Sequence, residues 1–458
     1  MEARPNSSVA RDQAYTLHPY ANARVIEQAG ALVVARGNGA HVVDEDGRAY
    51  IESVAGLWCA GLGFTANEKI IAAATDAMRT LPYYHQFGPK AHPNAIDLAE
   101  RLIGLAPAPM SKVFFACSGS EANDTALKLV RYYNNVRGRP EKKKIISRLR
   151  GYHGVTLASA SLTGLPYNHA LFDLPINGVL HTHCPHHYRG AEAGESEAEF
   201  VTRITNDLEA MIREEGSETI AAFIAEPVQG AGGVVVPPAG YFERVQEILA
   251  EHDILLIVDE VITGFGRTGN LWGSQTFNIR PDILTCAKML TSAYAPLSAV
   301  MVRDEIYEAI AEGSETIGTF GHGFTYGGHP VACAVGLAVL QHYEDADIMG
   351  HVGRLAPYFQ ERVASLGAHP MVGEVRGVGL VAGVEVVADK QTGRAFDKSE
   401  AVAPKVVARA QEHGLISRAI MDTIAVSPPL IVDEATVDGI VSRLHASLDD
   451  VARDRGIM

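Results

Sequence analysis

The chain has 458 residues, of which 47% are hydrophobic and 20% are charged, and its formal net charge is −15 at pH 7. This is the composition of an ordinary globular protein, and it excludes an intrinsically disordered, collagen-like or coiled-coil chain. The excess of Asp and Glu over Lys and Arg, 54 against 39, argues against nucleic acid as the main partner, because phosphate binding requires a basic surface.

The cysteines and the N-terminal residues indicate a cytoplasmic protein. Five cysteines are an odd number, and their spacing is not that of a disulfide framework. The first residues include no apolar signal segment, and no stretch has the roughly 18 apolar residues that a membrane-spanning helix requires. We therefore expect a reduced protein that is not bound to a membrane.

The N-terminal region is predicted to contain short strands. Residues 33–52 have apolar runs around two turn sequences, GNG at 37–39 and DEDG at 44–47. Glycine and asparagine at such positions are typical of tight turns between paired strands. We expect this region to form part of a small, partly β domain.

Six short apolar runs follow, and they alternate with helical patterns. Near-continuous apolar runs of this length are typical of strands that are buried on both faces. The runs lie at 112–116, 144–148, 221–227, 253–260, 282–288 and 297–302. Between the first two, apolar residues recur at the spacing of a helix. The sequence therefore predicts an α/β fold with a mostly parallel sheet and helices on both faces.

The pattern changes after about residue 340, to helix, small strands, helix, strand and helix. The last helix is predicted over 435–453, where apolar residues recur on one face. We expect residues 71–340 to form a large ligand-binding domain. Residues 341–458 would form a smaller α+β domain, to which the N-terminal segment 1–70 contributes.

The segment CSGSEAND at 117–124 follows a predicted strand and opens a helix. Gly119 would let the backbone approach a ligand closely, and Ser118 and Ser120 supply hydroxyl groups. The first turn of a helix adds unpaired N–H groups and the positive end of the helix dipole, which suits a phosphate group. An N-cap serine beside a glycine turn gives the same sequence, so the motif alone leaves both interpretations open.

Two further motifs place ionisable residues at the ends of apolar strands. In LLIVDEVITGFGRTG (255–269), Asp259 and Glu260 end a strand, where ligands of open α/β sheets bind. The alternative is a structural ion pair with Arg267. Lys288 ends the next apolar run, and burial there would lower its pKa and make its amine nucleophilic. The alternative is a lysine that reaches solvent.

The three motifs together provide a phosphate site, an acid that can keep a ring nitrogen protonated, and an amine that can form a Schiff base. This set is what pyridoxal 5′-phosphate requires from a protein. Its phosphate, ring nitrogen and aldehyde would each have one partner in this chain.

The chain resembles the class III aminotransferases of fold type I and, within them, the ω-amine:pyruvate transaminases. The motif DEVITGFGRTG, followed by a strand that ends in Ala-Lys, is specific to this group. The resemblance extends over nearly the whole chain through HPYANA (18–23), GLWCAGLGF (56–64), EPVQG (226–230), TYGG (325–328) and SPPLIV (427–432).

The resemblance implies a ping-pong transfer of an amino group from a primary amine to pyruvate. The donor would be an ω-amine or an aryl-alkyl amine, with S selectivity for chiral donors. Lys288 would form the Schiff base with pyridoxal 5′-phosphate and move the proton, and Asp259 would keep the pyridine nitrogen protonated. The alternative within the family is a β-alanine, diamine (putrescine) or γ-aminobutyrate transaminase.

The resemblance also implies the other site residues and a homodimer. The cofactor would be bound by Ser118, Gly119, Ser120, Tyr152, His153, Glu226, Asp259, Val261 and Lys288. Thr325 would reach the phosphate in the neighbouring subunit, and dimers can pair into tetramers. The substrate pocket would be lined by Tyr20, Leu57, Trp58, Phe87, Tyr152, Ala231 and Arg418. Arg418 would bind the acceptor's carboxylate and swing away for an apolar amine, unless it only caps a helix.

Four other features do not add a function. Met289 and Gly88 depart from the family pattern, which commonly has a glycine after the lysine and an aromatic pair at Phe87. The glycines of 264–269 match a dinucleotide-binding motif, but they do not directly follow a strand or open a helix. Residues 181–190, HTHCPHHYRG, lack the spacing of a zinc site, so we expect a surface or active-site-rim loop and no metal.

Overall fold

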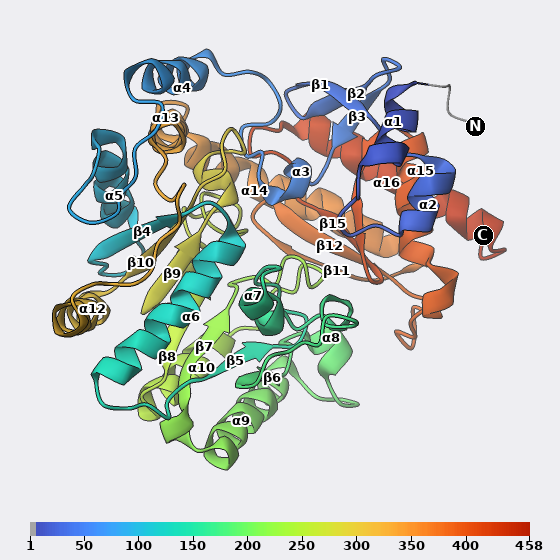
Figure 1. The fold of residues 1–458 in the computed structure, drawn as a ribbon. Helices are drawn as coiled ribbons and strands as arrows, with labels where there is room; N and C mark the ends of the chain where they lie inside the picture. Colours follow the sequence, from blue (N-terminus) through green and yellow to red (C-terminus); the bar gives the residue numbers. More distant parts are fainter. Residues whose placement is uncertain (1–5) are drawn as a thin grey trace.

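The computed structural model describes residues 6–458, in which helices surround three β-sheets (Figure 1). The strands are β1 (Val34–Asn38), β2 (His41–Asp44), β3 (Ala49–Glu52), β4 (Lys112–Ala116), β5 (Lys144–Arg148), β6 (Val179–Thr182), β7 (Ile220–Ala225), β8 (Leu255–Asp259), β9 (Ile283–Cys286), β10 (Ser298–Val302), β11 (Val372–Val378), β12 (Val381–Val386), β13 (Leu415–Ile416), β14 (Arg418–Ile420) and β15 (Thr423–Val426). The helices are α1 (Ser8–Tyr15), α2 (Ala23–Ala29), α3 (Ala55–Trp58), α4 (Glu68–Thr80), α5 (Pro93–Leu105), α6 (Gly119–Val136), α7 (Leu157–Leu162), α8 (His187–Gly190), α9 (Glu197–Glu215), α10 (Tyr241–Glu251), α11 (Gly273–Thr276), α12 (Asp304–Ile317), α13 (Pro330–Asp345), α14 (Ile348–Ala364), α15 (Val402–Glu412) and α16 (Glu434–Asp454).

The largest sheet has seven strands in the order β4-β10-β9-β8-β7-β5-β6. β10 is antiparallel to both of its neighbours, and the other six strands run parallel to one another. All six runs that the sequence predicted form strands of this sheet. The predicted α/β fold with a mostly parallel sheet is therefore confirmed. The seventh strand, β6, was not predicted, because its four residues, VLHT, include two polar side chains and form no continuous apolar run.

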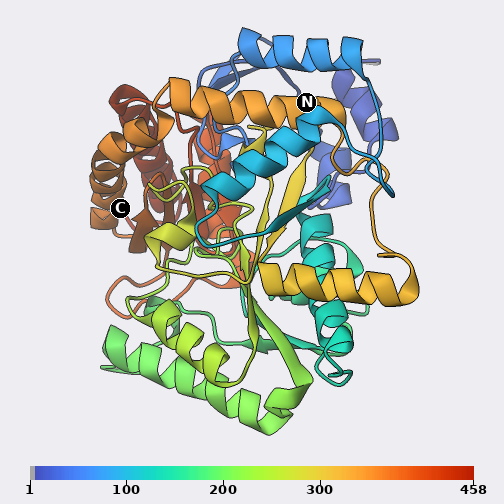
Figure 2. The ribbon, with the colours of Figure 1, turned by 90° about the vertical axis from the view of Figure 1, so that its left-hand side faces the viewer.

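Alternate residues of the central strands face different helices, as the period of a strand requires. Ala222 and Ile224 of β7 belong to the hydrophobic cluster that includes α6 and α12. Phe223 and Ala225 belong to the cluster that includes α9 and α10. Figure 2 shows α9 and α10 side by side, away from α12. Because both faces are covered, the strands have no polar alternation, which is the pattern that the sequence shows.

One of the two smaller sheets is formed by the C-terminal part alone, and the other joins both ends of the chain. One has the order β11-β12-β15-β14, and the other has the order β1-β2-β3-β13. In the second sheet, β13 from the C-terminal part pairs in parallel with β3, so that Ile416 lies beside Glu52. Residues more than 360 positions apart along the chain are thus neighbours here.

Neither a membrane-spanning helix nor a disulfide bond is found among the described residues. None of the helices within residues 6–458 has the length and apolar character needed to cross a lipid bilayer. The five cysteines all lie in this described part of the chain, and each is a free thiol.

Candidate active site

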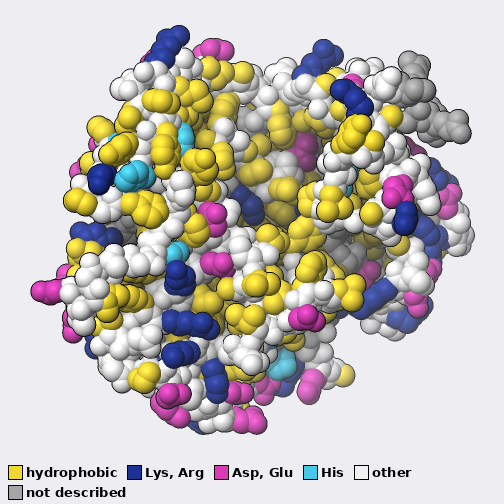
Figure 3. All heavy atoms as spheres, in the orientation of Figure 1, with side chains coloured by type: hydrophobic (Ala, Val, Ile, Leu, Met, Phe, Trp, Pro, Cys, Tyr) yellow, Lys and Arg dark blue, Asp and Glu magenta, His cyan; other side chains and the backbone are white. Residues whose placement is uncertain are grey.

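A cavity of about 200 Å³ lies at the carboxyl ends of β8 and β9, beside the start of α6. The residues that line it are Tyr20, Leu57, Trp58, Gly119, Ser120, Asn123, Tyr152, His153, Gly154, Tyr167, Glu226, Ala231, Asp259, Val261, Ile262, Lys288 and Arg418. In the space-filling view the surface is hollowed beside α3, with hydrophobic side chains around the hollow (Figure 3). The structure thus brings together all the predicted site residues except Ser118, Phe87 and Thr325.

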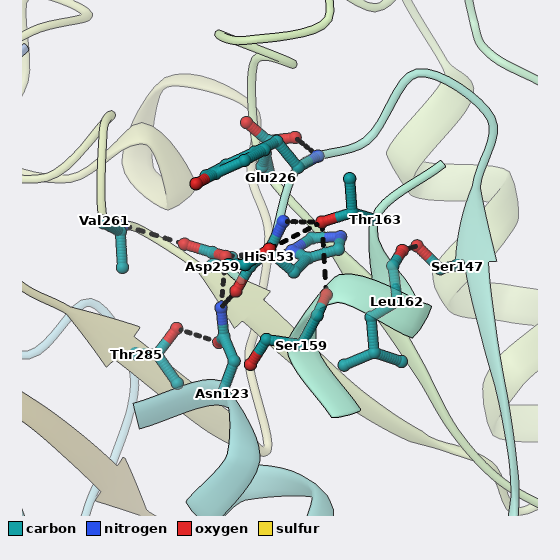
Figure 4. Close-up of polar contacts among 12 residues, drawn as sticks. Asn123, Ser147, His153, Ser159, Leu162, Thr163, Glu226, Asp259, Val261 and Thr285 are labelled. Carbon is teal, nitrogen blue, oxygen red and sulfur yellow. Dashed lines mark hydrogen bonds and ion pairs between the residues drawn. The ribbon is translucent and has the colours of Figure 1, made fainter. Parts of the chain in front are cut away.

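Asp259, the last residue of β8, is held by three hydrogen bonds (Figure 4). Its Oδ2 accepts from Asn123 Nδ2 at 2.7 Å and from His153 Nδ1 at 2.9 Å, and its Oδ1 accepts from the N–H of Val261 at 3.0 Å. Thr285 donates in turn to Asn123 Oδ1 at 2.9 Å, which fixes the orientation of the amide. Asp259 is 3% exposed, and these donors compensate its buried carboxylate.

Asn123 is a site residue that the sequence analysis missed. It is buried on α6, among apolar neighbours on the same helix. A signal was present in the sequence, because Asn123 follows Gly119 by four residues and therefore lies on the same face of the helix. A polar residue on an otherwise apolar helix face is expected to have a buried partner.

Glu260, the next residue, has a structural role. Its carboxylate accepts from the N–H groups of Gly273 and Ser274, and from the hydroxyl groups of Thr263 and Ser274. Arg267 donates instead to main-chain carbonyl groups of the C-terminal part of the chain. Neither acid pairs with Arg267, so the alternative of a structural ion pair is wrong. The glycines of 264–269 lie between β8 and α11 and open no helix.

Lys288 follows β9 with a backbone φ of 49°, a left-handed conformation that is uncommon for residues other than glycine. Such strain is found mainly at functional sites. Among the described residues its Nζ has no hydrogen-bond partner, and it lies 5.6 Å from the centre of the Trp58 ring. Burial lowers the pKa of Lys288, while the charge of Asp259 acts in the opposite direction. The lowered pKa favours the neutral form of an amine that lines the cavity.

The start of α6 opens toward the cavity. Ser118 is the N-cap, and its Oγ accepts from the N–H of Glu121 at 3.2 Å, so the capping interpretation holds for this serine. Gly119 and Ser120 line the cavity with N–H groups of the first helical turn. A Cβ atom at Gly119 would lie 3.0 Å from Val261 Cγ1, so a glycine permits this close approach. The arrangement suits an anion such as phosphate.

Glu226 orders two segments of the cavity wall. Its Oε1 accepts from the N–H of Tyr152 at 2.9 Å, and its Oε2 accepts from the N–H of Gly230 at 3.0 Å. Burial raises the pKa of Glu226 to about 7. The side chain therefore fixes Tyr152 and the segment before Ala231 on one side of the cavity.

Arg418 is the first residue of β14 and does not cap a helix. Among residues 6–458 its guanidinium has no ion pair or hydrogen bond, and its Cζ lies 5.3 Å from the centre of the Trp58 ring. Tyr20 and Tyr167 line the same part of the cavity, and Asn168 donates to the hydroxyl of Tyr20 at 2.7 Å. A free cation thus lies beside aromatic and aliphatic side chains. Tyr167 was not predicted, because no motif marks it.

Phe87 and Thr325 lie outside the lining of the cavity. Phe87 belongs to an exposed aromatic patch, which we define as Tyr83, Tyr84, Phe87 and Tyr326, and Thr325 lies beside this patch. Tyr83 donates to the carbonyl oxygen of Thr325 at 2.7 Å, and the rings of Tyr83 and Tyr326 are in edge contact at 5.8 Å. Exposed apolar patches of this kind mark interaction surfaces.

The two departures from the family pattern do not change the cavity. Met289 is fully buried, and its carbonyl oxygen accepts from the hydroxyl of Tyr343 at 2.8 Å. Gly88 has a φ of 63°, and no atom lies within 4 Å of the position of a Cβ. Neither residue lines the cavity.

The histidine-rich segment is a loop only at residues 183–186, where His183 is exposed, so the expectation of a surface or active-site-rim loop was correct only in part. Residues 181 and 182 belong to β6, and His186 is buried. His186 Nδ1 accepts from Arg150 at 3.0 Å, because arginine can only donate, and Nε2 donates to Glu374 at 2.8 Å. Although His186, Glu374 and Glu385 lie close enough to share an ion, Arg376 already pairs with both acids.

Comparisons with known proteins agree with this geometry. The family model "Aminotransferase class-III" matches residues 23–448. Gamma-aminobutyrate transaminase 1, mitochondrial, of Oryza sativa subsp. japonica is 50% identical over 412 residues, which are 90% of this chain and 80% of that protein. A solved ω-transaminase from Pseudomonas jessenii in complex with PMP is 50% identical, with a TM-score of 0.96, and the match covers 98% of this chain and 99% of that one. A transaminase solved with L-alanine is 55% identical, with a TM-score of 0.91 and coverage of 92% and 100%.

Proposed function

Because the chain belongs to the class-III aminotransferases, which use pyridoxal 5′-phosphate, we propose that it transfers the amino group of a primary amine to pyruvate. The donor would be an ω-amine or the S form of an aryl-alkyl amine. The observation that carries this proposal is the guanidinium of Arg418, which is unpaired among residues 6–458 and lies beside Trp58 in an otherwise largely aromatic and aliphatic wall. One such wall can receive either a carboxylate or an apolar side chain.

The lining of the cavity supports partners for the phosphate, the ring nitrogen and the aldehyde of the cofactor. The N–H groups at Gly119 and Ser120 would bind the phosphate, and Asp259 would face the ring nitrogen. Tyr152 and Val261 would contact the two faces of the ring. Lys288, whose amine has no partner in the described chain, would bind the aldehyde. When bound, pyridoxal 5′-phosphate supplies that aldehyde and a ring that accepts electrons.

Other residues of the cavity would control where protons are held and moved. The carboxylate of Asp259, fixed by Asn123 and His153, keeps a proton on the ring nitrogen. The Lys288 amine, with its lowered pKa, is a base that can accept a proton from the substrate carbon and return it. The ring of Trp58, which is 3% exposed, lies beside this amine at 5.6 Å.

Arg418→Ala is expected to lower kcat/KM for pyruvate by about 10- to 100-fold, because a charge-assisted bidentate pair is worth roughly 1.5–3 kcal/mol. The rate with an amine donor that lacks a carboxylate should fall much less. Separate measurement of the two half-reactions tests this prediction. Arg418→Lys is the matched control: it keeps the charge but loses the planar fork, so it should restore pyruvate use only in part. Equal losses in both half-reactions would contradict the role of Arg418.

A γ-aminobutyrate transaminase is the second candidate, and the identity to the rice enzyme favours it. Arg418 could bind the carboxylate of γ-aminobutyrate as well as that of pyruvate. A panel of donors, including (S)-1-phenylethylamine, β-alanine, putrescine and γ-aminobutyrate, separates the candidates when each is measured with pyruvate and with 2-oxoglutarate. Preference for γ-aminobutyrate over every amine that lacks a carboxylate would replace the first proposal by the second.

We also propose a homodimer in which Thr325 completes the phosphate site of the neighbouring subunit. The support is that Thr325 is exposed beside the aromatic patch and does not line the cavity of its own chain. Phe87, on the same patch, would then reach the neighbouring substrate pocket. The patch would be covered by the partner.

Co-expression of two inactive variants tests this arrangement. Thr325→Glu places a negative charge against the phosphate, and Lys288→Ala removes the amine. In a mixed dimer, one site would have Lys288 from one chain and Thr325 from the other, and so it would be intact. We expect mixed dimers to regain activity that neither parent has. Lack of recovery in isolated mixed dimers would show that Thr325 acts within its own chain or not at all.

A further inference from the structure

We infer that Glu52 is a positioning residue, which sets the shape of the amine-binding wall by holding the turn that carries Leu57 and Trp58. This inference rests on the proposed function, because it concerns the selection of the amine. Glu52 does not line the cavity, so it would act only through the residues of the turn.

The turn that carries Trp58 has an unusual backbone. Ala55, Gly56 and Trp58 have φ angles of 47°, 67° and 60°, so that three of four consecutive residues are left-handed and two of these have a Cβ. Although the segment is designated α3, Gly56 and Leu57 are not helical. A conformation of this kind persists only where its surroundings impose it.

Glu52 supplies the contacts that impose this conformation. It is the last residue of β3 and is 4% exposed. Its Oε2 accepts from the N–H of Gly56 at 2.6 Å and from the N–H of Val54 at 3.3 Å. One carboxylate oxygen thus joins the two N–H groups on either side of Ala55, the first left-handed residue.

The burial of Glu52 has no other explanation in the described chain. No cation lies within ion-pair distance of its carboxylate, and the nearest influence is the guanidinium of Arg267. Burial raises the pKa of Glu52 to about 7, and the charge of Arg267 acts against this rise. Burial of a carboxyl group without a paired cation costs free energy unless hydrogen bonds compensate for the lost water. Here the hydrogen bonds go to the turn.

The turn after β3 and Arg418 after β13 are connected by the pairing of these two strands. β13 pairs with β3 at Glu52 and Ile416, and Arg418 follows two residues later. The Arg418 guanidinium and the Lys288 amine both lie near the Trp58 ring, at 5.3 and 5.6 Å from its centre. Leu57, which is 55% exposed, lies at the open side of the cavity. A shift of the turn would therefore change the space for the amine's substituent beside both cations.

Glu52→Ala and Glu52→Gln test the inference on the holoenzyme. Alanine removes the acceptor, whereas glutamine keeps one oxygen and adds an N–H donor beside two others. We expect the ratio of kcat/KM for (S)-1-phenylethylamine to that for isopropylamine to change by about tenfold in Glu52→Ala, the size of a modest change in pocket shape. Glu52→Gln should change it in the same direction by a smaller factor.

Fluorescence quenching by acrylamide provides a readout that is independent of turnover. The chain has two tryptophans, Trp58 and Trp272, both buried, and Trp272 is anchored by a hydrogen bond to Leu105. In the Glu52 variants we expect one tryptophan to become more accessible to the quencher. Introducing Trp58→Phe into the Glu52 variants should abolish this increase, which assigns it to the turn.

Asp282→Asn is the matched control. Asp282 accepts from the N–H of Leu256 at 2.7 Å, at the end of β9 that is far from Lys288 along the strand. It should lower stability without changing the amine ratio or the quenching. If both Glu52 variants keep the parent's ratio and quenching, Glu52 does not position the turn. If the parent accepts none of these amines, the proposed function fails, while the quenching still decides the role of Glu52.

Discussion

Lys288→Ala is expected to abolish turnover, with a loss of about 10⁴-fold or more, even with excess pyridoxal 5′-phosphate. The variant loses both the amine that binds the aldehyde and the base that moves the proton. Within residues 6–458 Lys288 is the one lysine that lines the cavity, so no other described lysine can replace it. Borohydride reduction of the parent enzyme, followed by peptide mapping, should label Lys288 and no other residue.

Lys142→Ala is the control for this prediction. Lys142 is also buried, and burial also lowers its pKa, but its ammonium group lies near Asp253, outside the cavity. Its removal should therefore affect stability and leave the rate of each folded site unchanged. Turnover by Lys288→Ala close to that of Lys142→Ala, or labelling at another lysine, would contradict the assigned role.

Asp259→Asn is expected to lower kcat by about a hundredfold or more, which corresponds to roughly 3 kcal/mol of lost electrostatic stabilisation. Asparagine has nearly the same shape, and its oxygen can still accept from Asn123 and His153. Its NH₂ group, however, would face the N–H of Val261, where the carboxylate now accepts. The negative charge beside the ring nitrogen is lost, and both half-reactions should slow equally in single-turnover measurements.

Glu260→Gln is the control for the Asp259→Asn prediction. It shows whether removing the charge of a buried acid near the end of β8 is by itself enough to lower kcat. Glu260 is as buried as Asp259, but its hydrogen bonds go to residues 263, 273 and 274. We expect a lower melting temperature and an unchanged kcat for the folded protein. If Asp259→Asn reached the parent's rate in both half-reactions, the electron-accepting role of the ring would not depend on Asp259.

The strands of the large sheet, and the positions of Asp259 and Lys288 at strand ends, could be predicted because their signals are local. An apolar run that ends in Asp259 or Lys288 predicts that this residue lies at the end of a buried strand. In a parallel sheet the carboxyl ends of both strands then lie at the same edge. The same reasoning predicted the start of α6. Helix α16 was predicted over 435–453 and spans Glu434–Asp454, since its apolar face is continuous.

Residues that depend on distant partners could not be predicted in the same way. The burial of His186 follows from Arg150 and Glu374, which lie far from it in the sequence. The role of Glu52 follows from backbone angles that have no sequence motif. Asn123 and Tyr167 join the site through the packing of α6 and of the segment after α7.

The pairing of β13 with β3 also has a consequence for biosynthesis. Because Ile416 must lie beside Glu52, the wall that carries Trp58 and Arg418 cannot assemble while the polypeptide is still emerging from the ribosome. Contacts between such distant residues close a very long loop, and they form late and slowly during folding. The strands of the seven-stranded sheet are all synthesised by residue 302, whereas the wall to which we assign the selection of the amine needs residues 415–420 as well.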